Sequence, residues 1–338
     1  NLKNILITGG AGFIGSHICL NFLEQGFNLY IADSFLNSSK EVFNRLKNIL
    51  DISNNYDVKK INVFEGDIRN YKFLENIFLE ASNKNEAIDG VIHLAGLKSV
   101  FESTLDPTYY WDVNVNGSIN LLKVMMANNC KTILFSSSAT VYGNSGEIPF
   151  KESNLINPIN PYGETKATIE KILNNIFNSD SKSWRICVLR YFNPIGAHPS
   201  GMIGENPNGT PENIFPLILQ VASGLRKKLF VFGNDWPTQD GTCERDYIHV
   251  VDLAQAHIKA MQYLLKAKNC NLTLNVGKGL STSVLDLLKT FEKVNNVKIN
   301  FEFTSKRDGD IPISFADTSL SFKILNWKPK YNIEDMCK

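Results

Sequence analysis

The chain lacks the features that would tie it to a membrane, to nucleic acid or to a metal ion. It contains no run of about 18 or more apolar residues, so no membrane-spanning helix is predicted. Its 35 basic and 34 acidic residues leave a formal net charge of +1, which indicates no surface for nucleic acid or acidic lipid. The five histidines are scattered without the spacing of metal ligands, and we expect no metal site.

Cysteine is also scarce. The six cysteines form no CxxC pair, and most lie among apolar residues, as Cys187 does between Ile186 and Val188. Such positions are typical of reduced, buried thiols. We therefore expect a protein of the cytoplasm, where thiols stay reduced.

Short apolar runs alternate with helical patterns through the first half of the chain. Strands are expected at residues 5–7, 28–33, 61–67, 90–95, 132–137 and 185–190, and the first helix at residues 14–23. Because these apolar strands are separated by helices, they indicate a parallel sheet covered on both faces. The sequence therefore predicts an α/β fold with a doubly wound parallel sheet.

The pattern changes after Arg190. Residues 193–213 are rich in glycine and proline, which predicts a long binding loop. Strands at 229–232 and 272–276 then mix with a helix at 283–294. We expect two interleaved domains: residues 1–190, joined by later strands near 229–232 and 272–277, and a smaller mixed α/β domain over residues 191–338.

Three glycines near the start of the chain indicate a nucleotide site. Gly9, Gly12 and Gly15 lie between the first strand and helix, where glycine permits a tight turn, close approach of a pyrophosphate and helix–strand packing. Asp33 ends the next strand, where a carboxylate binds the adenosine ribose and repels a phosphate on it. The pattern favours NAD over NADP on a Rossmann-type sheet, with a flavin or another nucleotide as the alternative.

A tyrosine and a lysine lie one helical turn apart further along the chain. Tyr162 and Lys166 share one helix face, and an ammonium together with the positive ring of oxidised NAD would lower the pKa of the phenol. Ser138 follows the fifth predicted strand, where its hydroxyl can bind the same sugar hydroxyl as Tyr162. With the glycines, this set indicates redox chemistry on a hydroxyl. Without them, an ordinary amphipathic helix would explain Tyr162 and Lys166.

Segments spread over the whole chain carry a family resemblance. They are residues 8–17, 65–70, 93–98, 135–143, 189–199, 232–235 and 245–249. With them the chain resembles the UDP-glucose 4-epimerases, in the extended branch of the short-chain dehydrogenase/reductase superfamily. The resemblance implies NAD-dependent inversion at carbon 4 of a UDP-hexose through a 4-keto intermediate, which interconverts UDP-glucose and UDP-galactose.

The resemblance also implies roles for particular residues. Tyr162 resembles the base that takes the proton from the hydroxyl at carbon 4, Ser138 its hydrogen-bonding partner, and Lys166 the residue that binds the nicotinamide ribose. The positions that match cofactor contacts are Gly9, Gly12, Phe13, Ile14, Gly15, Asp33, Ser34, Asn37, Asp67, Ile68, Leu94, Lys98, Asn114, Lys166 and Tyr191. Those that match contacts to the UDP-sugar are Lys98, Ser138, Tyr162, Asn193, Asn213, Phe232, Arg245, Arg307, Asp310 and Ser314.

One of these positions bears on the choice of sugar. Members of the family restricted to UDP-glucose and UDP-galactose carry a bulky tyrosine at the position of Ser314. The serine leaves room for an N-acetyl group, so we expect UDP-N-acetylglucosamine and UDP-N-acetylgalactosamine as further substrates. The family also implies a homodimer, in which helices at about residues 107–129 and 161–177 pair across the contact.

Two other functions remain open from the sequence. A nucleotide-sugar 4,6-dehydratase on the same scaffold carries an Asp-Glu pair after the fifth strand, where this chain has Ala139 and Thr140, which cannot do that acid–base work. A non-catalytic NAD-binding regulator keeps the glycines but loses the tyrosine or the lysine, and this chain has both. The named side chains therefore favour the epimerase.

Overall fold

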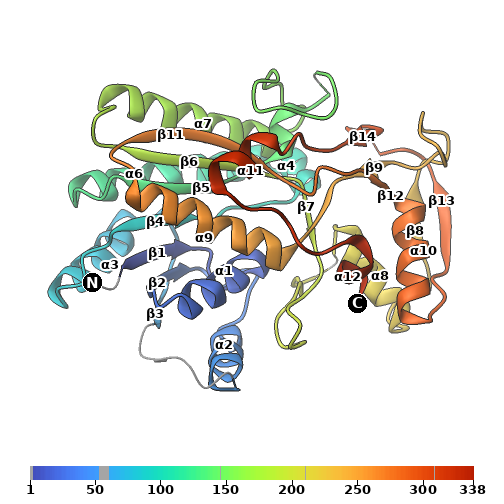
Figure 1. Cartoon of the computed structure of the whole chain (residues 1–338), viewed down its shortest axis with the longest axis horizontal. Helices are drawn as coiled ribbons and strands as arrows, with labels where there is room; N and C mark the ends of the chain where they lie inside the picture. Colours follow the sequence, from blue (N-terminus) through green and yellow to red (C-terminus); the bar gives the residue numbers. More distant parts are fainter. Residues whose placement is uncertain (1–2, 53–60, 145, 210, 308) are drawn as a thin grey trace.

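A computed structural model describes residues 3–52, 61–144, 146–209, 211–307 and 309–338 (Figure 1). Among them, seven parallel strands form the main sheet. Their order is β11 (Cys270–Val276), β6 (Arg185–Tyr191), β5 (Thr132–Ser138), β4 (Gly90–His93), β1 (Asn4–Thr8), β2 (Asn28–Asp33) and β3 (Ile61–Glu65). The strand order reverses between β1 and β4, which confirms the predicted Rossmann-type, doubly wound α/β fold.

Helices cover both faces of this sheet (Figure 1). One face packs against α1 (Phe13–Glu24), α2 (Glu41–Ile52), α9 (Val250–Lys266) and α11 (Ser319–Leu325). The other packs against α3 (Tyr71–Asn83), α6 (Gly117–Ala127) and α7 (Pro161–Ser179). Successive strand residues face opposite layers, as Ile5 and Leu6 do, and both are fully buried. Two covered faces explain why the strands read as continuous apolar runs.

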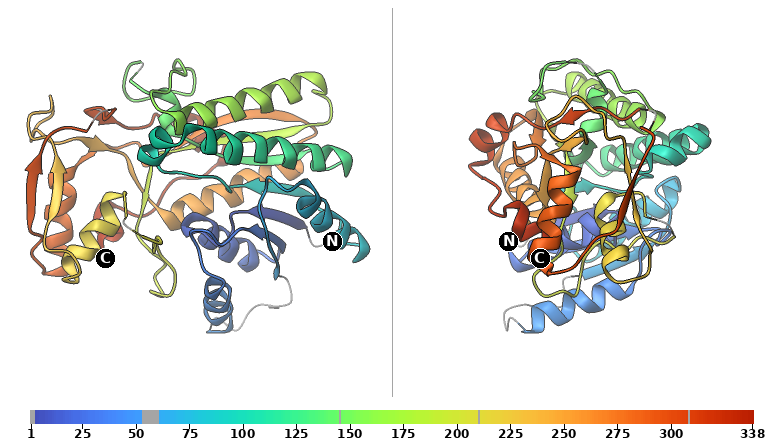
Figure 2. Two further views of the ribbon diagram at one scale, coloured as in Figure 1. Left: turned by 180° about the vertical axis from the view of Figure 1, so that it is seen from behind. Right: turned by 90° about the vertical axis from the view of Figure 1, so that its right-hand side faces the viewer.

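The helix expected at residues 107–129 is a nearly continuous helical stretch. After α4 (Val100–Leu105), it runs through α5 (Pro107–Tyr110), a π-helical turn η2 (Trp111–Asn116) and α6. Asp106 caps its start, where its Oδ1 accepts the N–H of Tyr109 at 3.0 Å, and Pro107 occupies the first turn. Helix α7 runs alongside this stretch (Figure 2).

The smaller part of the molecule is built from short strands and three helices. Strand β7 (Asn193–Ile195) pairs with β10 (Tyr247–His249), and β9 (Glu244–Arg245) lies between β12 (Thr282–Ser283) and β14 (Ile313–Ser314). Strand β8 (Leu229–Phe232) pairs with β13 (Phe301–Thr304). Helices α8 (Ile214–Ala222), α10 (Val284–Asn295) and α12 (Ile333–Cys337) pack around a separate apolar core.

One strand lies outside the sheet in which it was expected. Strand β11, expected to join the first domain, pairs with β6 in the main sheet, but residues 229–232 form β8 in the two-stranded sheet with β13. The burial pattern gives the reason: Leu229 and Val231 are buried while Phe230 is exposed. A strand with one exposed face suits the edge of a small sheet and not the interior of a doubly covered one.

The two parts are interleaved along the chain. Between β10 and β11 the chain returns as α9, which packs against α1 in the same apolar core. No helix in the described part of the chain is both long and apolar enough to cross a membrane.

Candidate active site

The residues predicted to form a site lie mainly at one edge of the main sheet. Strands β1, β2, β4, β5 and β6 all end there because they are parallel. Gly9 and Leu94 directly follow β1 and β4, Asp33 and Ser138 end β2 and β5, and Asn193 begins β7 just after β6. In open α/β sheets this carboxyl edge, next to the reversal of strand order, is where ligands bind.

The loop after β1 depends on its glycines. Gly9 has a φ of +74°, and a Cβ on it would lie 2.8 Å from the backbone nitrogen of Ala95. A Cβ on Gly15 would lie 2.2 Å from the carbonyl oxygen of Gly9, so helix and loop touch here. A Cβ on Gly12 would meet only that carbonyl, at 3.5 Å.

Helix α1 begins in that loop with open N–H groups. Gly12 is its N-cap and has no side chain to bind them, and Phe13 and Ile14 form the first turn. The space beside Gly12 and the uncapped helix start together fit a pyrophosphate.

Asp33 is held beside this loop. Its Oδ2 accepts the N–H of Ala11 at 2.9 Å, and its Oδ1 accepts the N–H of Phe35 at 2.9 Å and the hydroxyl of Ser38 at 3.1 Å. The carboxylate is therefore fixed at the end of β2, next to the glycines. A fixed, buried carboxylate suits a ribose diol and opposes a ribose phosphate, so the residues present fit NAD.

The loop after β2 touches the long loop of residues 193–213. The Oγ of Ser34 accepts the N–H of Leu36 at 3.4 Å. The Oδ1 of Asn37 accepts the N–H of Asn208 at 2.9 Å, and the Nδ2 of Asn208 donates to the carbonyl of Leu36 at 3.3 Å. Ser34 and Asn37 thus lie near Asp33, and Asn37 ties the long loop to the nucleotide-binding edge.

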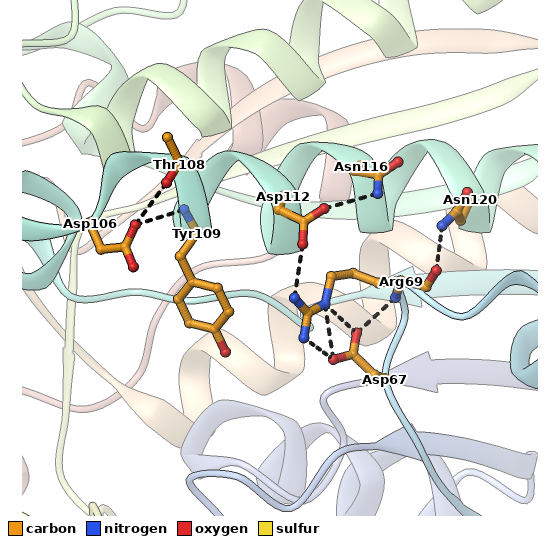
Figure 3. Close-up of polar contacts among 8 residues, drawn as sticks. All are labelled: Asp67, Arg69, Asp106, Thr108, Tyr109, Asp112, Asn116 and Asn120. Atoms are coloured by element: carbon orange, nitrogen blue, oxygen red, sulfur yellow. Dashed lines mark hydrogen bonds and ion pairs between the residues drawn. The ribbon is translucent and has the colours of Figure 1, made fainter.

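Asp67, in the loop after β3, is tied to the helical layer by an arginine that the sequence did not single out (Figure 3). Both oxygens of Asp67 accept hydrogen bonds from Arg69, and the Nη1 of Arg69 donates to Asp112 of η2 at 2.8 Å. The hydrogen bonds from Arg69 hold the pKa of the Asp67 carboxyl below its usual value. Ile68 between them is buried against Gly117, where a Cβ would lie 2.6 Å from its side chain.

Tyr162, Lys166 and Ser138 come together at the carboxyl edge of β5. Helix α7 is started by Asn160, whose Oδ1 accepts the N–H of Gly163 at 2.8 Å. The Nζ of Lys166 donates to the carbonyl of Ser136 at 2.9 Å and lies 5.8 Å from the ring centroid of Tyr162. The hydroxyl of Ser138 forms a hydrogen bond with Tyr162.

Burial controls the charge states of this pair. Burial raises the pKa of Tyr162 to about 12, and the hydrogen bond with Ser138 opposes the rise. Burial lowers the pKa of Lys166 to about 8, and the negative charge of Glu170 opposes the fall. The expected lowering of the pKa of Tyr162 by Lys166 is therefore not seen in the protein alone. A phenolate at neutral pH needs a further positive charge at this site.

Asn114 and Tyr191 form hydrogen bonds that join elements around the site. The amide nitrogen of Asn114 donates to the carbonyl of Leu97 at 3.0 Å and to Thr165 Oγ1 at 3.1 Å, and its oxygen accepts the N–H of Leu97 at 2.7 Å. Asn114 thereby joins the loop after β4 to the residue before Lys166. The hydroxyl of Tyr191 bonds His257 of α9. Leu94 donates its N–H to the carbonyl of Thr8 at 3.1 Å.

Four predicted substrate residues form one cluster in the smaller part. The Nη2 of Arg245 lies 3.7 Å from one oxygen of Asp310, and the Nε of Arg307 lies 3.0 Å from the other. The guanidinium of Arg307 also stacks over the ring of Phe232, 4.5 Å from its centroid. Two cations and an aromatic face suit a nucleoside diphosphate.

A second group of predicted residues gathers on the long loop. The Oε1 of Glu205 accepts the Nδ2 of Asn213 at 2.7 Å and lies 3.6 Å from the Nζ of Lys98. Sequence reasoning missed Glu205, because nothing distinguishes an acidic residue in a glycine-rich loop. Asn193 begins β7, and its N–H donates to the carbonyl of Asp246 at 2.9 Å.

The positions after Ser138 carry no carboxylate. Ala139 and Thr140 begin the short helix η3 (Ala139–Tyr142), and Thr140 Oγ1 donates to Ser138 Oγ at 2.9 Å. Thr140 thus holds the serine in place and offers no acid–base group.

The chain has close sequence relatives. It matches, over residues 6–338, the family model described as GDP-mannose 4,6 dehydratase. It is 45% identical over 336 residues to UDP-glucose 4-epimerase 2 of Arabidopsis thaliana, covering 99% of this chain and 93% of the relative. It is 44% identical over 333 residues to the UDP-glucose 4-epimerase of Bacillus subtilis, covering 98% and 94%.

Solved structures agree with these relatives. The UDP-glucose 4-epimerase of Stenotrophomonas maltophila, with bound NAD and formylated UDP-arabinopyranose, superposes with a TM-score of 0.92 at 43% identity, covering 99% of this chain and 96% of that one. The UDP-glucose 4-epimerase of Bifidobacterium longum, in complex with NAD+ and UDP, gives the same TM-score at 41% identity with the same coverage. The chain therefore belongs to the UDP-glucose 4-epimerase family, among the extended short-chain dehydrogenases/reductases.

Proposed function

We propose that this protein interconverts UDP-glucose and UDP-galactose by inverting carbon 4, with NAD as its resident cofactor. The observation that carries the proposal is the set of Tyr162, Ser138 and Lys166 at the sheet edge that also holds the glycine loop. NAD would lie along Gly12, Asp33 and the loops after β3 and β4, and when bound it supplies the acceptor and donor for the hydrogen at carbon 4. Residues 1–190 with β11 would form most of this cofactor domain.

In this proposal Tyr162 takes the proton from the hydroxyl at carbon 4 and returns it at the end of the turnover. Ser138 donates or accepts a hydrogen bond at the same oxygen, and so guides the proton. Lys166, which already donates to the Ser136 carbonyl, has further N–H groups for the nicotinamide ribose. Because Tyr162 is buried with a raised pKa, Lys166 and the cofactor's positive ring together have to favour the phenolate.

The substrate would be held mainly by its nucleotide. Arg245 and Arg307 would neutralise the diphosphate, and the ring of Phe232 supports the guanidinium of Arg307. The 4-keto sugar has to turn over between the two halves of the reaction, so few contacts should hold the sugar itself. Binding energy concentrated on the UDP group meets this need.

The same pocket would accept N-acetylated sugars. Ser314 is small and buried, and it lies beside Arg245 in the paired strands β14 and β9. A serine there leaves space that a tyrosine would fill. UDP-N-acetylglucosamine and UDP-N-acetylgalactosamine are therefore proposed as a second pair of substrates.

We also propose a homodimer, in the cytoplasm, that pairs α7 and the stretch of α5, η2 and α6 from each copy. Trp111 of this stretch is partly exposed, and with Ile156 and Pro158 among others it lines a hollow of about 680 Å³ beside α7. Apolar groups gathered around a hollow suit burial against a second copy. All six cysteines are free thiols, which suits the reducing cytoplasm.

The test is an incubation of the purified protein with UDP-galactose, without added cofactor, followed by chromatography. We expect UDP-glucose to form, with retained NAD released on denaturation. A 4-keto-6-deoxy product would indicate a dehydratase instead. If UDP-galactose is unchanged even with NAD supplied, the proposed function is wrong.

A further inference from the structure

A buried ion pair lies directly behind the proposed active site, and no step of the proposed mechanism uses it. Glu170 follows Lys166 by one turn of α7, and its side chain is 11% exposed. Its Oε2 accepts the Nη2 of Arg190 at 2.6 Å, and its Oε1 accepts the Nε of Arg190 at 3.1 Å. This is the bidentate arrangement that orients a carboxylate most firmly.

The same carboxylate also holds strand β5. The hydroxyl of Ser137 donates to the Oε1 of Glu170 at 2.5 Å. Ser137 stands between Ser136, whose carbonyl accepts the ammonium of Lys166, and Ser138, which bonds Tyr162. A shift of Ser137 would therefore move both contacts of β5 to the proposed catalytic groups. Phe135, Ile169 and Leu173 of this layer are buried, and Glu170 and Arg190 also line the hollow beside α7.

Arg190 fixes the far side of the carboxylate. Its Nη1 donates to the hydroxyl of Tyr142 at 3.0 Å and to the carbonyl of Glu152 at 3.1 Å. The hydroxyl of Tyr142 in turn donates to Asn275 of β11 at 2.6 Å. The carboxylate of Glu170 thus has little freedom to move, because its partner is held from β6 and β11.

The charge of Glu170 also acts on Lys166. The ammonium faces the ring of Phe135 at 5.0 Å and that of Tyr162 at 5.8 Å, and His93 of β4 is buried nearby. His93 is neutral there, because burial lowers its pKa to about 3. Among these neighbours Glu170 supplies the negative charge, and it opposes the loss of the proton from Lys166 that burial favours.

We propose that Glu170 is a positioning residue for the epimerisation: through Ser137 it sets Ser136 and Ser138 against α7, and through its charge it keeps Lys166 an ammonium. The proposal rests on the function proposed above. Glu170 would act in two ways, through the position of β5 and through its negative charge, and a separate variant tests each.

Glu170→Gln removes the charge and keeps the shape. In this variant we expect the alkaline limb of the kcat–pH profile to move to lower pH by about 1 unit, the size of effect of one adjacent charge. A second readout needs no substrate: the titration of Lys166, followed by NMR of lysine labelled with ¹³C at Cε and assigned with K166M, should shift in the same direction. If neither the alkaline limb of the kcat–pH profile nor the Lys166 titration moves, the proposed effect of charge is wrong.

Ser137→Ala removes only the hydrogen bond between β5 and the carboxylate of Glu170. We expect kcat to fall about 10-fold at every pH, with the alkaline limb and the Lys166 titration unmoved, since the charge stays. A kcat equal to that of the unaltered protein would overturn the effect of geometry. Glu170→Asp is a second test of geometry: it keeps the charge, but its shorter side chain loses these hydrogen bonds, so it should behave as Ser137→Ala does.

Glu152→Gln is the matched control. Glu152 is a half-buried carboxylate on the far side of Arg190, and its Oε1 accepts the N–H of Asn275 at 2.7 Å. The same change of charge there should move neither the kcat profile nor the titration of Lys166. If the unaltered protein shows no epimerisation, the proposed function fails, and the Lys166 titration still decides whether Glu170 controls its charge.

Discussion

Ser314 of β14 and Arg245 of β9 occupy paired positions in neighbouring parallel strands. Side chains at paired positions stand side by side on the same face of a sheet. Arg245 reaches toward Asp310 and Arg307, so Ser314 borders the cluster assigned to the diphosphate. Ser314 is 9% exposed, so a larger side chain at this position would have to displace its neighbours or extend toward this cluster.

Ser314→Tyr should therefore change the substrate range. We expect conversion of UDP-N-acetylgalactosamine to fall at least about 10-fold while conversion of UDP-galactose is largely kept, because steric exclusion of this kind costs about 1–3 kcal/mol. The kcat/KM of both substrates would be compared, with Ser314→Ala as the control that adds no bulk. If Ser314→Tyr converts the N-acetylated sugar as well as the unaltered protein does, the size of this side chain does not set the range.

Tyr162→Phe should abolish most of the activity and leave the fold intact. The phenol is the proposed proton acceptor, and loss of a general base lowers kcat by about 10²–10⁴-fold. Retained NAD and the thermal unfolding midpoint should match those of the unaltered protein. Tyr263→Phe, at an exposed position of α9, is the control. A kcat for Tyr162→Phe within about twofold of the control would show that another group moves the proton.

The strands of the main sheet that were expected over residues 5–190 could be read from the sequence to within two residues at each end. The pattern predicts strands at 28–33 and 185–190, and the structure has them at Asn28–Asp33 and Arg185–Tyr191. These strands are buried on both faces, so their apolar runs are unambiguous. The placement of β8 could not be read, because a short apolar run does not say which partner strand it meets.

The residues of the candidate site also differ in whether the sequence predicts them. Candidate residues such as Gly15 and Asp33 could be predicted from the sequence, because they lie in motifs with fixed spacing. Arg69, Glu205 and Glu170 could not, because each depends on a partner that is distant along the chain: Asp112, Lys98 and Arg190 respectively. Their roles follow from how the loops meet in space.

Two glycines of the first loop should separate stability from cofactor binding. Gly12→Ala places a Cβ 3.5 Å from the Gly9 carbonyl, which is ordinary contact, so the protein should fold while NAD binds more weakly. Gly15→Ala places a Cβ 2.2 Å from the same oxygen, so both stability and binding should fall. NAD content and thermal unfolding would be measured for both. Equal losses of stability would contradict this distinction.

Acid should destabilise the protein through its buried histidines. Burial lowers the pKa of His93 to about 3 and those of His17, His249 and His257 to about 4, against about 6.5 in the unfolded chain. Below pH 6.5 these histidines therefore bind protons in the unfolded chain but stay neutral in the folded protein. Stability contributed by these groups is present above pH 6.5 and is lost as the pH falls toward 4.

Asp246 acts in the opposite direction. Burial raises its pKa to about 6, above that of an unfolded aspartate, so its contribution is present at low pH and is lost as the pH rises through about 6. Burial also raises the pKa of Glu24, Glu152 and Asp252, so these groups act as Asp246 does. The lowered pKa values of the four histidines and of His198 oppose them, and we expect a net loss of stability on acidification. The unfolding free energy from urea titrations should fall between pH values of about 6.5 and 4.5, by up to about 1.4 kcal/mol per pH unit for each histidine. His93→Asn should reduce this slope, because it removes one titrating group while keeping a donor and an acceptor. An unfolding free energy that stays constant over this range would show that these histidines accept protons in the folded protein.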